Sequence, residues 1–533
     1  MTRAGLSVDG HSLTLSALEA VAVEGAEVRL QLDPEARRRI TDSYELNRRL
    51  VAEGRPLYGI TTGVGKAVDR QIGSDRAAAL QANLIRFLGC GTGERLPEEE
   101  CRATVLARVN CLARGFSAVR PELIERLVQL LNLGVAPSIP ALGSVGASGD
   151  LVPSSYVAAV VMGEREVFFS GSLHSAEAVH RQLGLEPLSL EPKEGLALVN
   201  GTCLMTGIGA LATQRARRLA PVADACTALA VEVLRGVDAP FEPFLHEVKP
   251  HPGQVRSAAQ IRRLLSGSGL AREYASAVES LGTLKDGSRR LPLNLQDHYS
   301  LRCAPQCIGA LYDGVEWVAG ILATELNSSN DNPLYDLDAG EVRSGGNFAG
   351  FHVGLAMDTL KVAVASVADL LDRQFALIND EQYNNGLGVC CRHPLPDDHP
   401  EAGIHHGFKG MQLVISALTA EALNACTPMT VFSRSTACHN QDKVSMAATA
   451  ARQARRVVDL TERAAAVHLL LLAQAADLRG VEALAPATRS VYEHVRELSA
   501  YVERDRPLDE DVERVASAIR SGDLARRIEE TTG

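Results

Sequence analysis

Apolar residues recur along most of this chain with the spacing of an α-helix. Between Pro121 and Gly134 they occupy positions i, i+3, i+4 and i+7, which predicts an amphipathic helix. Further helices are predicted from about Met357 to Ile378 and from about Val444 to Leu478, a stretch without Pro or Gly. At 1.5 Å per residue the last would be roughly 50 Å long, and a helix of that length needs neighbouring helices to cover it.

Alternating strand patterns are rare, and one short hairpin is predicted around Val167–Phe169. The chain is therefore predicted to be predominantly all-α, with a central bundle of long helices and a small mixed N-terminal part. Three parts are expected: an N-terminal domain over residues 1–200, the long-helix bundle over 201–480 and a C-terminal helical segment over 481–533.

Composition narrows the class of protein. Of the 533 residues, 46% are apolar and 22% charged, as in a folded globular chain. The net charge of −11 and an aromatic content of 4% argue against a nucleic-acid or anionic-membrane binder. The most apolar later run, Ala464–Ala476, is too short to span a membrane and suits a buried helix. No signal-peptide pattern opens the chain, and its 11 scattered cysteines contain no CxxC pair, so free thiols and a cytoplasmic location are expected.

The segment Gly143–Pro153 (GSVGASGDLVP) is the first candidate for chemistry. One interpretation is a glycine-rich turn with Ser148 as a helix N-cap, and another is a phosphate-binding loop, although no Gly-Lys-Ser/Thr follows. A third is cyclisation of Ala147-Ser148-Gly149: the Gly149 nitrogen attacks the Ala147 carbonyl carbon, two waters leave, and Ser148 becomes the methylene of a 4-methylideneimidazol-5-one (MIO) ring. Glycine suits the attacking position because no Cβ hinders its nitrogen. These three residues alone do not decide between the interpretations.

Two other glycine-rich segments resemble nucleotide-binding loops only in part. Tyr58–Lys66 lacks the residues that a phosphate-binding loop needs at Ile60 and Ala67, so it is interpreted as a mobile loop that presents Tyr58. Gly207–Ala212 has dinucleotide-loop spacing but lies within a helical pattern, which favours helix packing.

Polar clusters follow later in the chain. Gln296, Tyr299 and Arg302 are spaced to share one helical face, and Arg302 is either a carboxylate clamp or an ordinary surface charge. The segment Glu325–Pro333 is either an amide-rich scaffold or an Asx-rich turn. The Cys- and His-rich stretch 390–406 has no repeating ligand spacing and contains three prolines, so a solvated loop is favoured over a metal site.

Taken together, these segments resemble the aromatic amino-acid ammonia-lyase and aminomutase family, whose members use an MIO electrophile. The resemblance covers nearly the whole chain, in the family's order, through YGITTGVG, QANLIRFLGCGTG, GSVGASGDLVP, GLALVNGT, QDHYSLRCAPQ, ELNSSNDNPL, GGNFAG, GFKG and HNQDKVSM. It implies an aspartase/fumarase-like helical fold and an N-terminal domain that carries the electrophile. It further implies an MIO formed autocatalytically from Ala147-Ser148-Gly149, with no metal and no external cofactor. The departures are His298, Ser154 and Val64, which stand where the family usually has Pro, Leu and an aromatic residue.

The resemblance also implies a reaction. An L-arylalanine would give an arylacrylate and ammonia, because the substrate amine adds to the former Ser148 carbon and leaves with its electrons drawn into the ring. Tyr58 would be the general base, Arg302 would hold the substrate carboxylate, and Asn200 would orient the electrophile and that carboxylate. The supporting residues implied are Tyr299, Gln296, Asn347, Phe348, Lys409, Glu421 and Gln441, the last near the amine.

Substrate preference is expected to depend on Leu84, Phe87 and Leu88, because in this family the residues at the Phe87-Leu88 pair contact the substrate ring. An apolar pocket penalises a buried hydroxyl by about 1–3 kcal/mol, so phenylalanine is the expected substrate and trans-cinnamate the product. The alternatives are a phenylalanine or tyrosine 2,3-aminomutase, a tyrosine or histidine ammonia-lyase, and an inactive protein on the same scaffold. The resemblance further implies a homotetramer with active sites shared between subunits, and neither a nucleic-acid nor a membrane partner.

Overall fold

Helices make up most of the chain. The computed structural model describes residues 5–291 and 294–532, with 59% of the structure helical and 7% in strands, so the predominantly all-α prediction is confirmed. The chain divides into two compact units, each assembled from three separate stretches. Unit 1 comprises Met1–Gln214, Val318–Asp358 and Pro428–Arg455, and unit 2 comprises Arg215–Trp317, Thr359–Thr427 and Arg456–Gly533. The three consecutive domains expected from the sequence stay a prediction.

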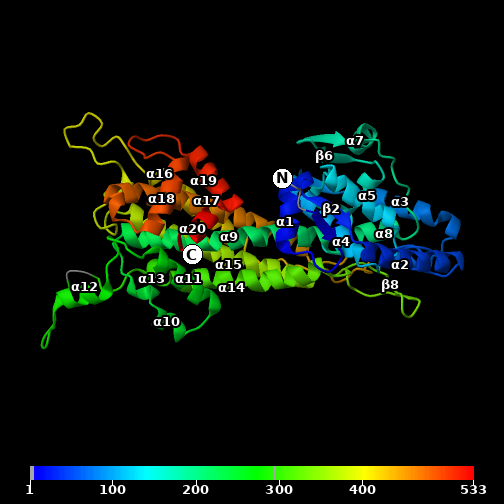
Figure 1. Cartoon of the computed structure of the whole chain (residues 1–533), viewed down its shortest axis with the longest axis horizontal. Helices are drawn as coiled ribbons and strands as arrows, with labels where there is room; N and C mark the ends of the chain where they lie inside the picture. The colour runs from blue at the N-terminus through cyan, green and yellow to red at the C-terminus, as the bar shows by residue number, and fades with distance from the viewer. Residues whose placement is uncertain (1–4, 292–293, 533) are drawn as a thin grey trace. The chain divides into compact units, whose positions relative to one another are not determined.

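Four long helices begin in one unit and end in the other (Figure 1). They are α9 (Cys203–Val233), α14 (Ala304–Leu326), α15 (Phe351–Asn379) and α17 (Ala447–Arg479). The second and third predicted helices are confirmed by α15 and α17, and the whole run 464–476 within α17 is buried. Among the described helices, only α14 is long and apolar enough to cross a membrane by length and composition, a test that core helices of soluble proteins also pass.

Unit 1 holds the N-terminal helices and all the described strands. Its helices are α1 (Leu15–Glu24), α2 (Pro34–Ala52), α3 (Ala77–Phe87), α4 (Glu98–Ala113), α5 (Pro121–Asn132), α6 (Leu151–Val161), α7 (Ala176–Leu183) and α8 (Glu194–Val199). Its strands are β1 (Gly5–Val8), β2 (Arg29–Leu32), β3 (Thr92–Arg95), β4 (Ala136–Pro137), β5 (Pro140–Leu142), β6 (Glu166–Phe169), β7 (Ser172–Ser175), β8 (Leu334–Asp336) and β9 (Glu341–Arg343). Among these described strands, β1 and β2 pair in parallel, whereas β3–β5, β4–β6–β7 and β8–β9 are antiparallel. The predicted helix after Pro121 is α5, and the predicted hairpin is β6–β7.

Unit 2 is built from shorter helices around its portions of the four long ones. They are α10 (Pro243–Glu247), α11 (Pro252–Leu264), α12 (Tyr274–Leu281), α13 (Tyr299–Arg302), α16 (Lys409–Asn424), α18 (Pro486–Leu498), α19 (Asp509–Ser521) and α20 (Asp523–Thr532). The expectation that Gln296 shares a helical face with Tyr299 and Arg302 is wrong. Helix α13 begins only at Tyr299, three residues after Gln296, and its N-cap His298 has a non-helical ψ of 154°.

Packing in unit 1 brings three functional segments together. Helix α8 packs against both α3 and α6. The Gly143–Gly149 loop lies between β5 and α6, and the Tyr58 loop leads into α3. At the N-terminal part of α9, Gly207 packs closely on α4, since a Cβ there would lie 3.1 Å from the backbone of Ala103 and Thr104. The helix-packing interpretation of Gly207–Ala212 is therefore confirmed.

Candidate active site

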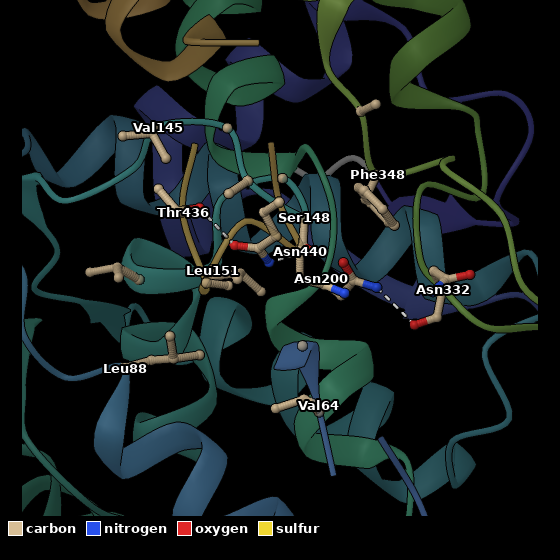
Figure 2. A pocket seen from close by; sticks show the side chains of 18 of the residues that line it. Val64, Leu88, Val145, Ser148, Leu151, Asn200, Asn332, Phe348, Thr436 and Asn440 are labelled. Carbon is tan, nitrogen blue, oxygen red and sulfur yellow. Dashed lines mark hydrogen bonds between the residues drawn. The ribbon is translucent and has the colours of Figure 1, made fainter. Parts of the chain in front are cut away.

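A cavity of about 850 Å³ opens in unit 1 at the glycine-rich loop. Many residues singled out from the sequence line it: Tyr58, Leu84, Phe87, Leu88, Ala147, Ser148, Gly149, Asn200, Phe348 and Gln441. In the view of Figure 2, Leu88 and Leu151 lie on one side of Ser148, and Phe348 and Asn332 lie on the other. The cavity therefore combines apolar walls with polar groups near Ser148, as small-molecule sites generally do.

The loop that carries Ser148 is sharply kinked. The backbone φ is +51° at Ser148 and +75° at Gly149. A Cβ on Gly149 would lie 2.0 Å from the carbonyl oxygen of Gly201, so this position admits only glycine. Gly201 N donates to the Ser148 carbonyl oxygen at 3.1 Å, and Asp150 N donates to the Gly201 carbonyl at 2.7 Å. These two hydrogen bonds hold the kink against the start of α9.

This geometry fits cyclisation of Ala147-Ser148-Gly149. The attacking nitrogen belongs to a residue without Cβ, and the carbonyl that becomes the ring carbonyl already accepts a hydrogen bond from Gly201. The Ser148 hydroxyl oxygen accepts a hydrogen bond from Gln441 Nε2 at 3.0 Å. The N-cap interpretation of Ser148 is wrong, because the N-cap of α6 is Asp150, two residues further on.

Asp150 lies fully buried behind the loop. Its carboxylate accepts hydrogen bonds from Ser144 Oγ at 2.9 Å and from Met205 N at 3.0 Å. Burial raises the pKa of the Asp150 carboxyl to about 6, although these hydrogen bonds oppose the shift. Asp150 thereby joins the electrophile loop to the first turn of α9.

Asn200 is held by a buried ion pair. Its Nδ2 donates to the Asn332 carbonyl at 2.8 Å and to Asp331 Oδ1 at 3.3 Å, and Asp331 Oδ2 lies 2.5 Å from Lys193 Nζ. Both charged side chains are 0% exposed. Burial lowers the pKa of Lys193, and Asp331 opposes that shift. The Asn200 carboxamide oxygen has no partner among the described residues, so this cavity-lining residue keeps one free hydrogen-bond acceptor.

A buried arginine fixes the backbone around Asn200. Arg108 is 1% exposed, and its Nη1 donates to the carbonyls of Ala197 and Asn200 at 3.2 and 3.0 Å. These carbonyls lie at the C-terminal end of α8, where helical acceptors lack partners within the helix. Arg108 therefore determines how the chain leaves α8 towards Gly201.

The loop that presents Tyr58 is held by hydrogen bonds from the buried side chain of Gln81. Gln81 Nε2 donates to the Gly59 carbonyl at 2.9 Å, and Gln81 Oε1 accepts from Leu196 N at 3.0 Å, so one buried amide joins the loop, α3 and α8. The phenol oxygen of Tyr58 accepts a hydrogen bond from Gly65 N at 3.1 Å. This hydrogen bond joins the two ends of the loop and fixes the position of the phenol oxygen.

The apolar wall is formed at the end of α3. Leu84 and Leu88 are buried, whereas Phe87, the last residue of the helix, has 62% of its surface exposed. All three line the cavity, together with Val64 from the tyrosine loop and Phe348.

Several residues expected at the site do not line this cavity. They are Gln296, Tyr299, Arg302, Asn347, Lys409 and Glu421, of which all but Asn347 belong to unit 2. Asn347 Nδ2 donates to the Ser329 carbonyl at 3.2 Å. Arg302 Nε donates to the Asp297 carbonyl at 3.1 Å, and its guanidinium lies 4.5 Å from the Tyr299 ring centroid. Glu421 pairs with Arg456 at 2.8 Å, and Lys409 is exposed at the start of α16. Their roles stay predictions.

Other cavity residues were not singled out from the sequence. Leu196, Asn332 and Lys443 lie within quoted motifs, so closer attention to those motifs would have found them. No local signal marks Phe351 or Thr436. In residues 5–291 and 294–532, no group of three or more His, Cys, Asp and Glu side chains is placed to hold a metal ion. All eleven cysteines are free thiols.

Comparisons with known proteins agree with this site. The sequence model of the family described as aromatic amino acid lyase matches residues 13–497. The chain is 40% identical to an MIO-dependent tyrosine 2,3-aminomutase of Streptomyces globisporus, over 99% of this chain and 97% of that protein. It is also 40% identical to a histidine ammonia-lyase of Symbiobacterium thermophilum, over 98% of each. The solved structure of tyrosine aminomutase from Streptomyces globisporus matches with a TM-score of 0.93 and 38% identity, over 99% of this chain and 98% of that one.

A helical fold with a glycine-rich loop kinked at Ala147-Ser148-Gly149 defines the chain as a carbon–nitrogen lyase of the MIO-dependent class. It belongs to the aromatic amino acid lyase family, in which the electrophile forms autocatalytically and no external cofactor is needed. These relatives are a tyrosine aminomutase and a histidine ammonia-lyase, so they do not support the phenylalanine preference expected from the sequence.

Proposed function

We propose that this protein eliminates ammonia from an aromatic L-α-amino acid, either releasing the arylacrylate or returning ammonia to its β-carbon as an aminomutase. The observation that carries the proposal is the kinked Ala147-Ser148-Gly149 loop lining the same cavity as Tyr58. The MIO formed there supplies an electrophilic carbon for the substrate amine. The relatives reported above favour a tyrosine aminomutase or a histidine lyase, whereas the apolar wall described next favours phenylalanine.

The chain's own groups divide the remaining work. Tyr58 takes the β-hydrogen, and the Gly65 N–H stabilises its oxygen. Gly201 N donates to the Ser148 carbonyl oxygen, where charge gathers during the reaction. The apolar wall of Leu84, Phe87 and Leu88 receives the substrate ring and offers no hydrogen bond to a phenol. This wall supports phenylalanine as the preferred substrate within the wider aromatic class.

Product analysis tests the reaction. Purified protein is incubated separately with L-phenylalanine, L-tyrosine, L-histidine and L-tryptophan. Ultraviolet absorbance then detects the arylacrylate, and chromatography detects β-amino acids. A β-amino acid identifies an aminomutase, and an arylacrylate with ammonia identifies a lyase. The control is Ser148→Ala, which cannot form the methylene and should lose turnover by several orders of magnitude. Absence of any product from all four substrates contradicts the proposal.

We further propose a cytoplasmic homotetramer whose subunits complete one another's sites. Five residues expected at the site do not line the cavity in unit 1 of the same chain, and another subunit would supply them: Arg302, Tyr299, Gln296, Lys409 and Glu421. Large apolar side chains exposed on the long helices and α16 support burial by other copies: Trp317, Val362, Leu413 and Leu423 are 45–73% exposed.

Subunit complementation separates a shared site from a self-contained one. Tyr58→Phe and Arg302→Ala are each expected to be inactive alone. If sites are shared, co-expression of the two variants in one cell forms mixed tetramers, and some of their sites carry both wild-type residues. Partial recovery of turnover in the mixed protein supports the shared site, and no recovery in a confirmed mixed tetramer contradicts it.

A further inference from the structure

The hydroxyl group of Ser148 is held by a residue from a distant part of the chain. Gln441 Nε2 donates to Ser148 Oγ at 3.0 Å, and Gln441 Oε1 accepts from Thr436 Oγ1 at 2.9 Å. The backbones of Thr436 and Gln441 also pair, with N–O distances of 2.8 and 3.2 Å. Thr436, Asn440 and Ser148 lie close together in Figure 2. One short closed turn therefore delivers an amide donor to the serine oxygen.

The segment that carries Gln441 is fastened to the electrophile loop at a second point. Met446 N donates to the Val145 carbonyl at 3.0 Å. A Cβ on Gly146 would lie 2.2 Å from Ser445 Oγ, so the two segments pack with no space between them. The segment 436–446 thus contacts the electrophile loop at two points, and the Gln441 amide lies beside Ser148.

Maturation of this loop requires the serine oxygen to leave. In the first dehydration, Gly149 N bonds to the Ala147 carbonyl carbon, and that carbonyl oxygen departs as water with the amide hydrogens of Gly149 and Ser148. In the second, the Ser148 Cβ–Oγ bond breaks, the Cα proton leaves with the hydroxyl as water, and the Cα=Cβ bond forms. No oxidant is needed. The second step is difficult because hydroxide is a poor leaving group, and a donor at the departing oxygen stabilises the charge that develops on it.

We infer that Gln441 acts in this second dehydration, by donating a hydrogen bond to Ser148 Oγ as it leaves. Thr436 is a positioning residue in this step, because its hydroxyl holds the far end of the Gln441 amide. The inference rests on the electrophile of the proposed function. It gives Gln441 a task before any substrate binds, in addition to the position near the amine expected from the sequence.

Intact mass of the denatured protein tests the inference without measuring activity. The mature wild type should be about 36 Da lighter than its sequence mass, since two waters are lost in the cyclisation chemistry. Gln441→Glu keeps the side chain's size but replaces the donor with an acceptor. We expect this variant to accumulate protein lighter by only one water, and its second dehydration to be slower by about 10²-fold, the usual effect of losing one oxyanion donor.

Two further variants sharpen the test. Thr436→Val keeps the Gln441 donor but loosens it, so the second dehydration should slow by less than in Gln441→Glu; this variant carries the test if Gln441→Glu does not fold. Asn440→Ala changes a neighbouring cavity residue and should show the full two-water loss at the wild-type rate. If folded Gln441→Glu loses both waters at the wild-type rate, the inference is wrong. A wild-type mass without any water loss would instead contradict the proposed function itself.

Discussion

Replacing Phe87 by histidine is the most direct test of how the cavity selects its substrate. Phe87 is the last residue of α3, is 62% exposed, and lines the cavity between the buried side chains of Leu84 and Leu88. None of these three side chains carries a polar group that could bind a phenol. A tyrosine substrate that places its hydroxyl there loses hydrogen bonds to water without replacement. The loss costs about 1–3 kcal/mol, or roughly 5- to 150-fold in kcat/KM relative to phenylalanine.

Phe87→His changes both terms of this comparison in the same direction. The imidazole offers a hydrogen-bond partner to the phenol and removes part of the apolar contact with a phenyl ring. The ratio of kcat/KM for phenylalanine over tyrosine should therefore fall at least about tenfold. Phe87→Leu is the matched control, because it alters size without adding a polar group and should leave the ratio within about threefold.

Steady-state kinetics on both substrates measure the ratio, and intact mass verifies that the electrophile has formed in each variant. An unchanged ratio in a mature, folded Phe87→His protein would show that Phe87 does not face the substrate ring. The phenylalanine preference argued from this wall would then be refuted as well.

Three further predictions concern the base, the buried charges and acid stability. Tyr58→Phe should lower kcat by about 10²–10⁴-fold with little change in KM; a variant that keeps a tenth of the wild-type kcat contradicts the general-base role. Lys193→Met leaves Asp331 buried without its cation and should lower the free energy of unfolding by about 3–5 kcal/mol in denaturant titrations. A loss below about 1 kcal/mol would exclude a strongly coupled buried pair, and Lys193→Met/Asp331→Leu should recover most of the loss. Burial lowers the pKa of His468 to about 3, so between pH 6.5 and 3 only the unfolded chain binds this proton. The free energy of unfolding should therefore decrease as the pH is lowered through this range, by about 1.4 kcal/mol per pH unit. His468→Gln should lose less stability than the wild type on acidification, and identical pH profiles would refute this.

Helical periodicity was sufficient to locate the long elements. The Pro- and Gly-free stretch 444–478 corresponds to α17, and the alternation around Val167 corresponds to β6. The first prediction succeeds because no Pro or Gly interrupts the stretch, and its run 464–476 is buried on every side in α17. The second succeeds because Val167 is buried next to the exposed Glu166, as alternation along a strand requires. Motif order likewise predicted the loop of Tyr58 and the kinked turn at Ser148, since glycines at fixed spacing mark backbone that other residues cannot adopt.

The sequence did not predict which polar residues pair with one another in the folded protein, because the partners lie far apart along the chain. Lys193 follows a proline and precedes a glutamate, a setting typical of a solvated turn, yet its ammonium group is fully buried against Asp331, 138 residues away. Thr436 carries no local signal because its importance comes from the Gln441 amide. The Gln296 expectation failed for a local reason, since periodic spacing predicts a shared face only where the backbone is helical throughout.

The distance along the chain between the electrophile loop and its support has a consequence for biosynthesis. Ser148 and Gln441 are separated by 293 residues. At a translation rate of about 5–20 residues per second, roughly 15–60 s pass between the synthesis of the first and that of the second. During this interval the loop lacks the turn that holds the serine oxygen. Most of the chain is therefore synthesised before the loop has its full set of hydrogen bonds, and the catalytic centre is completed only once the last fifth of the protein emerges from the ribosome.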